Sequence, residues 1–183
     1  MSTFVKDRDF LLVGVEELEK YLLSGELFWP LSSNVDLPRL TIGGLLLADK
    51  RLSGWNASEE DRAKLARLKN RLDALRSKWH VAWDKKAARE VHARFELWKN
   101  YLADYRQSSE ENAPDYPQQV GERVMLALLA SGIAVPPAEF RALKDLDHFL
   151  REVLLPGPFG WETELAAVFP VDEYWYLYGK LKT

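Results

Sequence analysis

Two of the three histidines are the residues of this 183-residue sequence whose spacing first suggests chemistry. His80 lies four residues before Asp84, and His92 lies four residues before Glu96. Residues four apart share a helix face, and a histidine with a carboxylate in that arrangement can ligate a metal ion. His80 and His92, however, lie about 120° apart around a helix. We therefore expect ordinary helix-surface pairs, with no metal and no cofactor, and keep a helical metal-dependent enzyme as the third hypothesis.

Motifs for covalent catalysis are missing from the sequence. It contains no cysteine, which excludes disulfides, thiolate metal sites and cysteine nucleophiles. It also contains no Gly-x-Ser-x-Gly motif, no phosphate-binding glycine loop and no recognisable pair of catalytic carboxylates. We therefore assign no catalytic residue. The lack of a motif lowers the expectation of an enzyme without disproving it.

Basic residues concentrate between Arg62 and Arg94, where eleven Lys or Arg stand against three acidic residues. This segment carries a charge of +8 while the whole chain carries −3, so the remainder sums to −11. The segment could bind a polyanion, with two tryptophans stacking on bases. The candidate binding residues are Lys64, Arg67, Arg71, Lys78, Trp79, Trp83 and Lys85.

The alternative is that these cations flank a helical seam and pair with acidic residues of the same chain or of a second subunit. Because the remainder of the chain is acidic, we favour this alternative. A protein partner or a second copy of the chain is therefore expected ahead of a nucleic acid.

Aromatic residues crowd the last part of the chain. They are Trp161, Phe169, Tyr174, Trp175, Tyr176 and Tyr178. Adjacent aromatic positions cannot all be hidden against one face, so some of them must meet another element, a ligand or another subunit. We favour packing of this tail onto the long helical segment described next, with a homodimer surface as the alternative.

The segment from Ser58 to Ser108 contains no Gly and no Pro and carries a helical apolar repeat. The stripe comprises Leu65, Leu68, Leu72, Leu75, Trp79, Trp83, Ala87, Val91, Phe95, Trp98, Leu102 and Tyr105. Ser58 is a good N-terminal cap. Successive steps of four residues shift the stripe near 78–84, which predicts a continuous or kinked helix. The alternative is two helices, one ending near Trp79 and another beginning near Trp83, packed as a hairpin.

Shorter elements are predicted on both sides of this segment. Before it we expect a strand or extended lead-in at 9–15, a helix at 15–23, a turn at 26–30, a loop at 32–38 and a helix at 42–52 capped by Thr41. Gly43 and Gly44 would let another backbone come close. After it we expect a linker at 108–117, helices at 117–131 and 137–155, an irregular stretch at 155–160 and short helical pieces at 162–168 and 172–181.

These patterns together predict an all-α protein, an irregular helical bundle organised around one long central helix. We expect a single domain, with short helices in 1–56, the long helical segment in 58–108 and further helices in 116–183. The expected function is that of a non-catalytic helical scaffold or protein-interaction module, with polyanion binding as the alternative. No signal-peptide pattern and no apolar run of the ~18–20 residues that cross a bilayer is present, so we expect a cytoplasmic protein without membrane contact.

Overall fold

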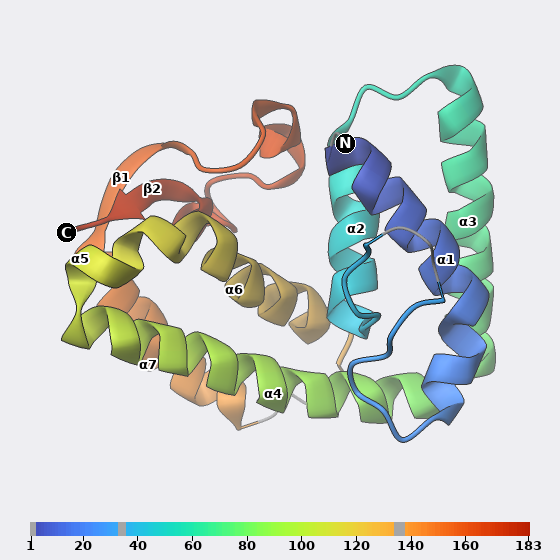
Figure 1. The fold of residues 1–183 in the computed structure, drawn as a ribbon, viewed down its shortest axis with the longest axis horizontal. Coiled ribbons are helices and arrows are strands. Elements are labelled where there is room, and N and C mark those ends of the chain that lie inside the picture. The colour runs from blue at the N-terminus through green and yellow to red at the C-terminus, as the bar shows by residue number, and fades with distance from the viewer. Residues whose placement is uncertain (1–2, 33–35, 134–137) are drawn as a thin grey trace. The chain divides into compact units, whose positions relative to one another are not determined.

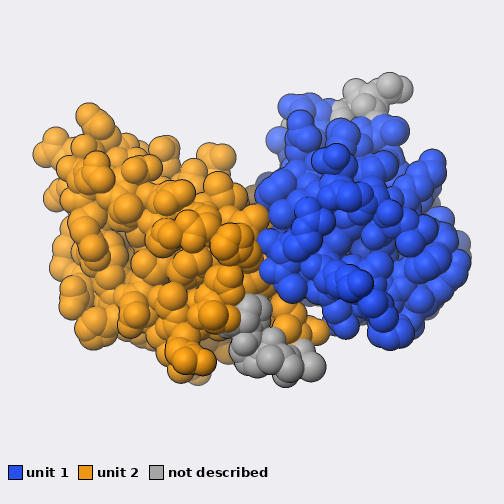
Figure 2. All heavy atoms as spheres, turned by 90° about the horizontal axis from the view of Figure 1, so that it is seen from below, with its two compact units in different colours: residues 1–90 blue, residues 91–183 orange. Residues whose placement is uncertain are grey.

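The described part of the computed structural model, residues 3–32, 36–133 and 138–183, is mostly helical. Within these ranges the chain forms seven α-helices, three 3-10 helices and one two-stranded antiparallel sheet (Figure 1). The prediction of an all-α fold with a dominant long helical segment is confirmed. The chain divides into two compact units, residues 1–90 (unit 1) and 91–183 (unit 2), which Figure 2 colours separately. The expected single domain stays a prediction.

Helix α1 of unit 1, Thr3–Leu23, replaces the strand and short helix predicted at 9–15 and 15–23. The prediction of a strand was wrong because Gly14 does not interrupt the helix. A Cβ at Gly14 would lie 2.9 Å from Cδ2 of Leu45, so the glycine lets α1 pack closely against α2. The other buried positions of α1 follow a helical repeat: Phe10, Leu11, Val15, Leu18, Tyr21 and Leu22.

Helix α2, Ile42–Gly54, begins where the sequence predicted. Oγ1 of Thr41 accepts a hydrogen bond of 3.0 Å from the Gly44 N–H, which confirms Thr41 as the cap. The group that approaches Gly44 is the ring of Phe10, with Cζ 3.3 Å from the position of a Cβ. The prediction of a close backbone at this glycine was therefore wrong.

The long segment is two helices, α3 (Glu59–Lys78) and α4 (His80–Gln107), which meet at a corner (Figure 1). The break falls at Trp79, with φ −112° and ψ 32°, inside the window where the apolar stripe shifts. The alternative was right that one helix ends near Trp79 and a second follows it, but wrong that the two pack as a hairpin. The kink predicted near 78–84 is found as this corner. Trp79 N–H still donates to Leu75 O and Trp83 N–H to Trp79 O, both at 2.9 Å. The corner needs no Gly or Pro because these backbone groups remain paired.

Unit 2 is built on the second part of α4. Five stripe residues of this part are buried as predicted: Val91, Phe95, Trp98, Leu102 and Tyr105. The prediction of a linker at 108–117 was wrong, since α5 (Ser109–Asn112) and a 3-10 helix (Ala113–Asp115) occupy it. The Asn112 amide donates to the carbonyls of Asp104 and Ser108 at 3.2 and 2.9 Å. Polar side chains here pair with backbone carbonyls at the end of α4. Sequence composition alone cannot distinguish such a helix end from a loop.

Helices α6 (Tyr116–Ala130) and α7 (Glu139–Val153) confirm the two helices predicted after residue 116. The predicted loop at 32–38 lies partly outside the described residues, and Pro137, predicted to begin the second helix, lies wholly outside them.

The C-terminal part forms β1 (Leu154–Phe159) and β2 (Tyr178–Leu181), which pair antiparallel. The prediction of an irregular stretch at 155–160 was therefore wrong. The short helical piece predicted at 172–181 is found only as a 3-10 helix at Trp175–Leu177, because 178–181 is a strand. Gly179 has φ +149°, and a Cβ there would lie within van der Waals overlap of the Leu155 carbonyl oxygen. The pairing requires glycine at this position. Two 3-10 helices, Thr163–Val168 and Trp175–Leu177, lie between the strands, and the first confirms the helical piece predicted there.

The aromatic tail is largely core. Phe169, Tyr174 and Tyr176 are buried, and the Phe169 ring packs edge to face against Tyr174, with centroids 5.1 Å apart. The tail is joined to α4 through the Tyr105 hydroxyl, which donates to Lys182 O at 2.8 Å. Tyr176 is held by α6, whose Tyr116 hydroxyl donates to the Tyr176 carbonyl oxygen at 2.6 Å. Packing of the aromatic residues onto the long segment therefore stays a prediction.

Candidate functional site

Four predicted binding residues lie on one face of α3. Lys64, Arg67, Arg71 and Lys78 fall within an arc of about 60° around the helix axis, and all four are exposed. Lys64 pairs with Glu60 at 2.6 Å and Lys78 with Glu19 at 3.1 Å. The guanidinium groups of Arg67 and Arg71 have no ion-pair or hydrogen-bond partner among the described residues. We call these four residues the α3 basic face.

The basic residues on the other side of the α3 apolar stripe are mostly engaged within unit 1. Lys69 pairs with Asp49 at 2.8 Å, and the hydrogen bond to this carboxylate raises the pKa of Lys69. The Arg76 guanidinium lies over the Trp83 ring, 5.1 Å from its centroid. This side of α3 therefore stabilises unit 1 and leaves few cations for a partner.

The two tryptophans do not offer a stacking surface. Trp83 is 2% exposed, so the prediction that its ring could stack on bases was wrong. Trp79 is half-buried, and Lys78 covers its ring with Nζ 4.9 Å from the centroid. Lys85 is exposed in α4, beyond the corner, so it does not extend the line of cations on α3.

The histidines have partners other than those their spacing suggested. Nδ1 of His92 lies 2.9 Å from Oε1 of Glu139, while Glu96 pairs with Lys99 at 2.6 Å. Nδ1 of His80 lies 3.4 Å from the Ser77 carbonyl oxygen. Across residues 3–32, 36–133 and 138–183 no three histidine or acidic side chains converge as a metal site would require.

Three charged residues of α4 are buried. Arg94 pairs with Glu122 of α6 at 2.7 Å, whereas Lys86 and Glu90 each bond to backbone groups at the end of another helix. Lys86 is 3% exposed, and its ammonium donates to the carbonyls of Ser24 and Glu26, just past the end of α1. Burial lowers the pKa of Lys86, and the nearby charge of Arg89 lowers it further. Glu90 is fully buried and accepts from the Gly43 N–H in the first turn of α2, at 3.0 Å from either oxygen. Sequence reasoning missed both roles, because no local signal identifies a cap supplied from a distant helix.

Unit 2 contains a half-buried ion pair between α6 and α7. The Arg123 guanidinium donates through Nε and Nη2 to Asp147 at 2.8 and 2.7 Å. It also lies over the Tyr176 ring, 4.5 Å from the centroid. Burial acts to lower the pKa of Arg123, but the hydrogen bonds to Asp147 outweigh it and raise the pKa. This pair fixes the spacing of the two helices.

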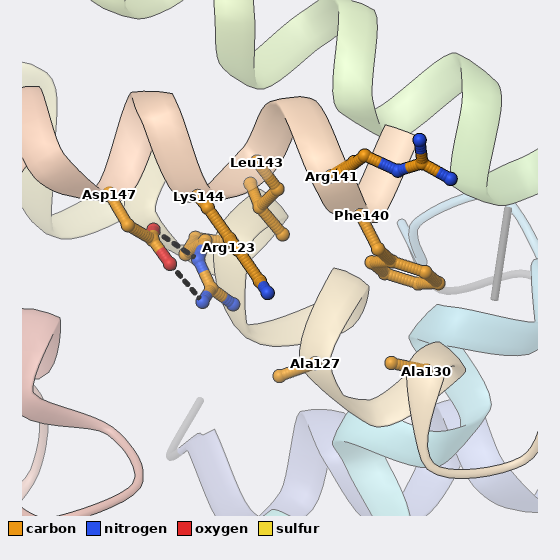
Figure 3. Close-up of a pocket in the computed structure, with 8 residues that line it drawn as sticks. All are labelled: Arg123, Ala127, Ala130, Phe140, Arg141, Leu143, Lys144 and Asp147. Atoms are coloured by element: carbon orange, nitrogen blue, oxygen red, sulfur yellow. Dashed lines mark hydrogen bonds and ion pairs between the residues drawn. The ribbon is translucent and has the colours of Figure 1, made fainter. Parts of the chain in front are cut away.

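A cavity of about 750 Å³ opens beside this ion pair, lined by residues of α6 and α7 (Figure 3). From α6 come Arg123, Ala127 and Ala130; from α7 come Phe140, Arg141, Leu143, Lys144 and Asp147. Phe140 and Lys144 point toward α6, whereas Arg141 points away from it (Figure 3). Sequence reasoning missed this site. The signal was the spacing of 123, 127 and 130, which places one arginine and two alanines on a single helix face.

Comparison with known proteins identifies no relative: no family, no curated protein and no solved structure matches this chain. None of the helices in the described ranges combines the length and apolar character that a bilayer crossing requires.

Proposed function

We propose that this chain is a non-catalytic binding module that recognises an acidic segment of a protein partner through the α3 basic face. The observation that carries the proposal is the state of Arg67 and Arg71. Both are exposed, they lie one helical turn apart, and neither has a partner for its guanidinium among the described residues. Most other cations of α3 are paired within unit 1.

The rest of α3 supports an electrostatic mode of binding. Leu72 is the one buried residue of this helix, so α3 is attached to unit 1 along a narrow line. Its outward positions carry short side chains, and all of them are exposed: Ala63, Ala66, Asn70, Ala74 and Ser77. Without a large apolar anchor on this side, the two arginines are the groups that a partner meets. Guanidinium groups bind carboxylates with two parallel hydrogen bonds.

A protein partner is favoured over a nucleic acid by charge. Unit 2 holds nine Lys or Arg against fourteen Asp or Glu, and unit 1 holds sixteen against fourteen. A protein that binds DNA through about 6–10 phosphate contacts depends on as many cations on one surface. The α3 basic face offers four cations, two of them already paired, and Trp83 is buried. A short run of carboxylates on a protein fits this number better than a phosphate backbone.

The test is binding of poly-glutamate and of duplex DNA to the purified protein at low and high salt. We expect poly-glutamate to bind at low salt and to dissociate as salt is raised, since exposed ion pairs are screened. Arg67→Glu/Arg71→Glu should abolish this binding. Lys6→Glu/Lys180→Glu reverses the same number of exposed charges on other elements and should retain it.

Three results would contradict the proposal. One is DNA binding that exceeds poly-glutamate binding and disappears in the arginine variant, which would assign the face to a nucleic acid. Another is equal loss of binding in both double variants, and the third is no binding at any salt concentration. Light scattering on a sizing column, run on the same samples, shows whether the acidic partner is a second copy of the chain.

A further inference from the structure

The cavity between α6 and α7 has a polar end and an apolar end. Arg123, Lys144 and Asp147 gather at one end, while Phe140 and Ala130 line the other (Figure 3). This separation suits a molecule with a charged group at one end of an apolar body. We propose that the cavity binds a small amphipathic carboxylate, and that this site acts independently of the α3 basic face.

The charge of the lining favours an anion. Among the described residues of the lining Asp147 is the single acidic one, and its carboxylate accepts from Nε and Nη2 of Arg123. The Lys144 ammonium is exposed, points toward α6 and has no ion-pair partner in the described part of the chain (Figure 3). The polar end therefore carries one uncompensated positive charge, which attracts a carboxylate and repels an ammonium group.

Arg123 offers a second donor to the same carboxylate. Its guanidinium has five N–H groups, and the Asp147 carboxylate accepts from only two of the guanidinium nitrogens, Nε and Nη2. The Nη1 nitrogen makes a long contact of 3.5 Å with the Tyr176 hydroxyl. A ligand carboxylate oxygen placed between Nη1 and the Lys144 ammonium would accept hydrogen bonds from both. The half-buried ion pair of Arg123 and Asp147 would stay intact.

The apolar end of the cavity determines the size and shape of the apolar group that a ligand can carry. Ala127 and Ala130 leave space on the α6 side, and Phe140 and Leu143 supply apolar surface from α7. The distance along α6 from Arg123 to Ala130 is about 10 Å at the helical rise of 1.5 Å per residue. The volume of about 750 Å³ lies within the range of about 300–1,000 Å³ usual for small-molecule sites. A medium-length aliphatic chain or a single aromatic ring fits this end.

The experiment uses octanoate as the probe, with octanol and octylammonium as matched compounds that share its chain but not its charge. Binding to the full-length protein is followed by two-dimensional NMR of the backbone amides. We expect octanoate to bind most tightly and octylammonium least tightly. The shifted amides should cluster in α6 and α7, including those of Ala127 and Ala130.

Two variants test the two ends of the cavity. Lys144→Glu should weaken octanoate binding by about tenfold, since it replaces an attraction by a repulsion close to the carboxylate. Ala127→Leu should weaken octanoate and octanol alike by filling the apolar end, and Ala130→Leu serves the same purpose if the first variant does not fold. Lys180→Glu, an exposed reversal in β2, is the control and should bind as the wild type does.

The proposal is overturned if octanol or octylammonium binds as tightly as octanoate, if Lys144→Glu leaves the affinity unchanged, or if the shifted amides lie outside α6 and α7. The Arg67→Glu/Arg71→Glu variant should bind octanoate normally. Loss of octanoate binding in that variant would contradict the independence of the two sites, whereas failure of poly-glutamate binding alone leaves the cavity proposal standing.

Discussion

Replacing Lys86 by Met should destabilise unit 1, because Lys86 satisfies the end of α1. Its ammonium donates to the carbonyls of Ser24 and Glu26 and lies 4.3 Å from the centroid of the Tyr21 ring. Hydrogen bonds from a charged donor contribute about 1.5–3 kcal/mol each. Methionine keeps most of the aliphatic stem and removes the cost of burying the charge, which is several kcal/mol and offsets part of the loss. We expect the free energy of unfolding to fall by about 2 kcal/mol.

The measurement is urea unfolding followed by tryptophan fluorescence at neutral pH, with Lys85→Met as the control. Lys85 is the preceding residue of the same helix and is exposed, so its replacement should change the free energy of unfolding by no more than about 0.5 kcal/mol. If Lys86→Met is as stable as the wild type, or if both variants lose the same stability, the capping role assigned to Lys86 is wrong.

Two further predictions concern α3 and the buried tyrosines. Leu72→Ala should lower the free energy of unfolding by about 2–4 kcal/mol because the side chain is 3% exposed. Leu68→Ala, at a half-buried position, should lower it less. Equal losses of the two variants in urea unfolding would show that α3 is not attached mainly through Leu72. Burial raises the pKa of both Tyr116 and Tyr176, so the folded protein keeps their protons at a pH where the unfolded chain, with a phenol pKa of about 10, releases them. Their contribution to stability is therefore complete below about pH 10 and declines above it, by about 1.4 kcal/mol per pH unit for each group. Urea unfolding between neutral pH and pH 11 should show this decline, Tyr176→Phe should reduce its slope, and a flat profile would contradict the assignment.

The basic residues of the chain differ in how far they are available to a partner. Lys86 and Arg123 are used internally, at a helix end and in a half-buried ion pair respectively. Arg67, Arg71 and Lys144 are exposed, and their charged groups have no partner among the described residues. Each proposed site therefore includes a charge that the fold does not use internally: Arg67 and Arg71 on α3, and Lys144 on α7. Variants of these three residues should reduce binding while leaving the unfolding transition nearly unchanged.

The helical architecture could be predicted from the sequence because a periodic apolar pattern is a local property. The stripe through Trp98 and Leu102 is buried as predicted, and Thr41 and Ser58 cap the helices that follow them. The sequence also indicated the corner at Trp79, because the apolar stripe changes phase near 78–84. Predictions failed where a local pattern has two meanings. Gly14 suggested the end of an element, yet in the structure it is the site of close packing between α1 and Leu45.

The C-terminal strands could not be predicted in the same way. Residues 154–159 and 178–181 are short and contain Pro or Gly, and neither shows the alternation of an isolated strand. They become strands because each satisfies the backbone groups of the other, with Leu154 opposite Leu181. Such a pairing depends on residues far apart in the chain, which composition and periodicity do not record.

The sequence by itself determined that this protein is helical, that it lacks the motifs of covalent catalysis, and that its positive charge lies in the segment around α3. Tertiary structure alone decided which charges remain available. Lys85 and Lys86 are adjacent and identical in type, but one faces solvent and the other caps α1. The cavity between α6 and α7 likewise lies beside the pair of Arg123 and Asp147, which joins two helices that are separate in the sequence. The physical reason is the same in both cases: a buried polar group must find a partner, and in a folded chain that partner is chosen by proximity in space.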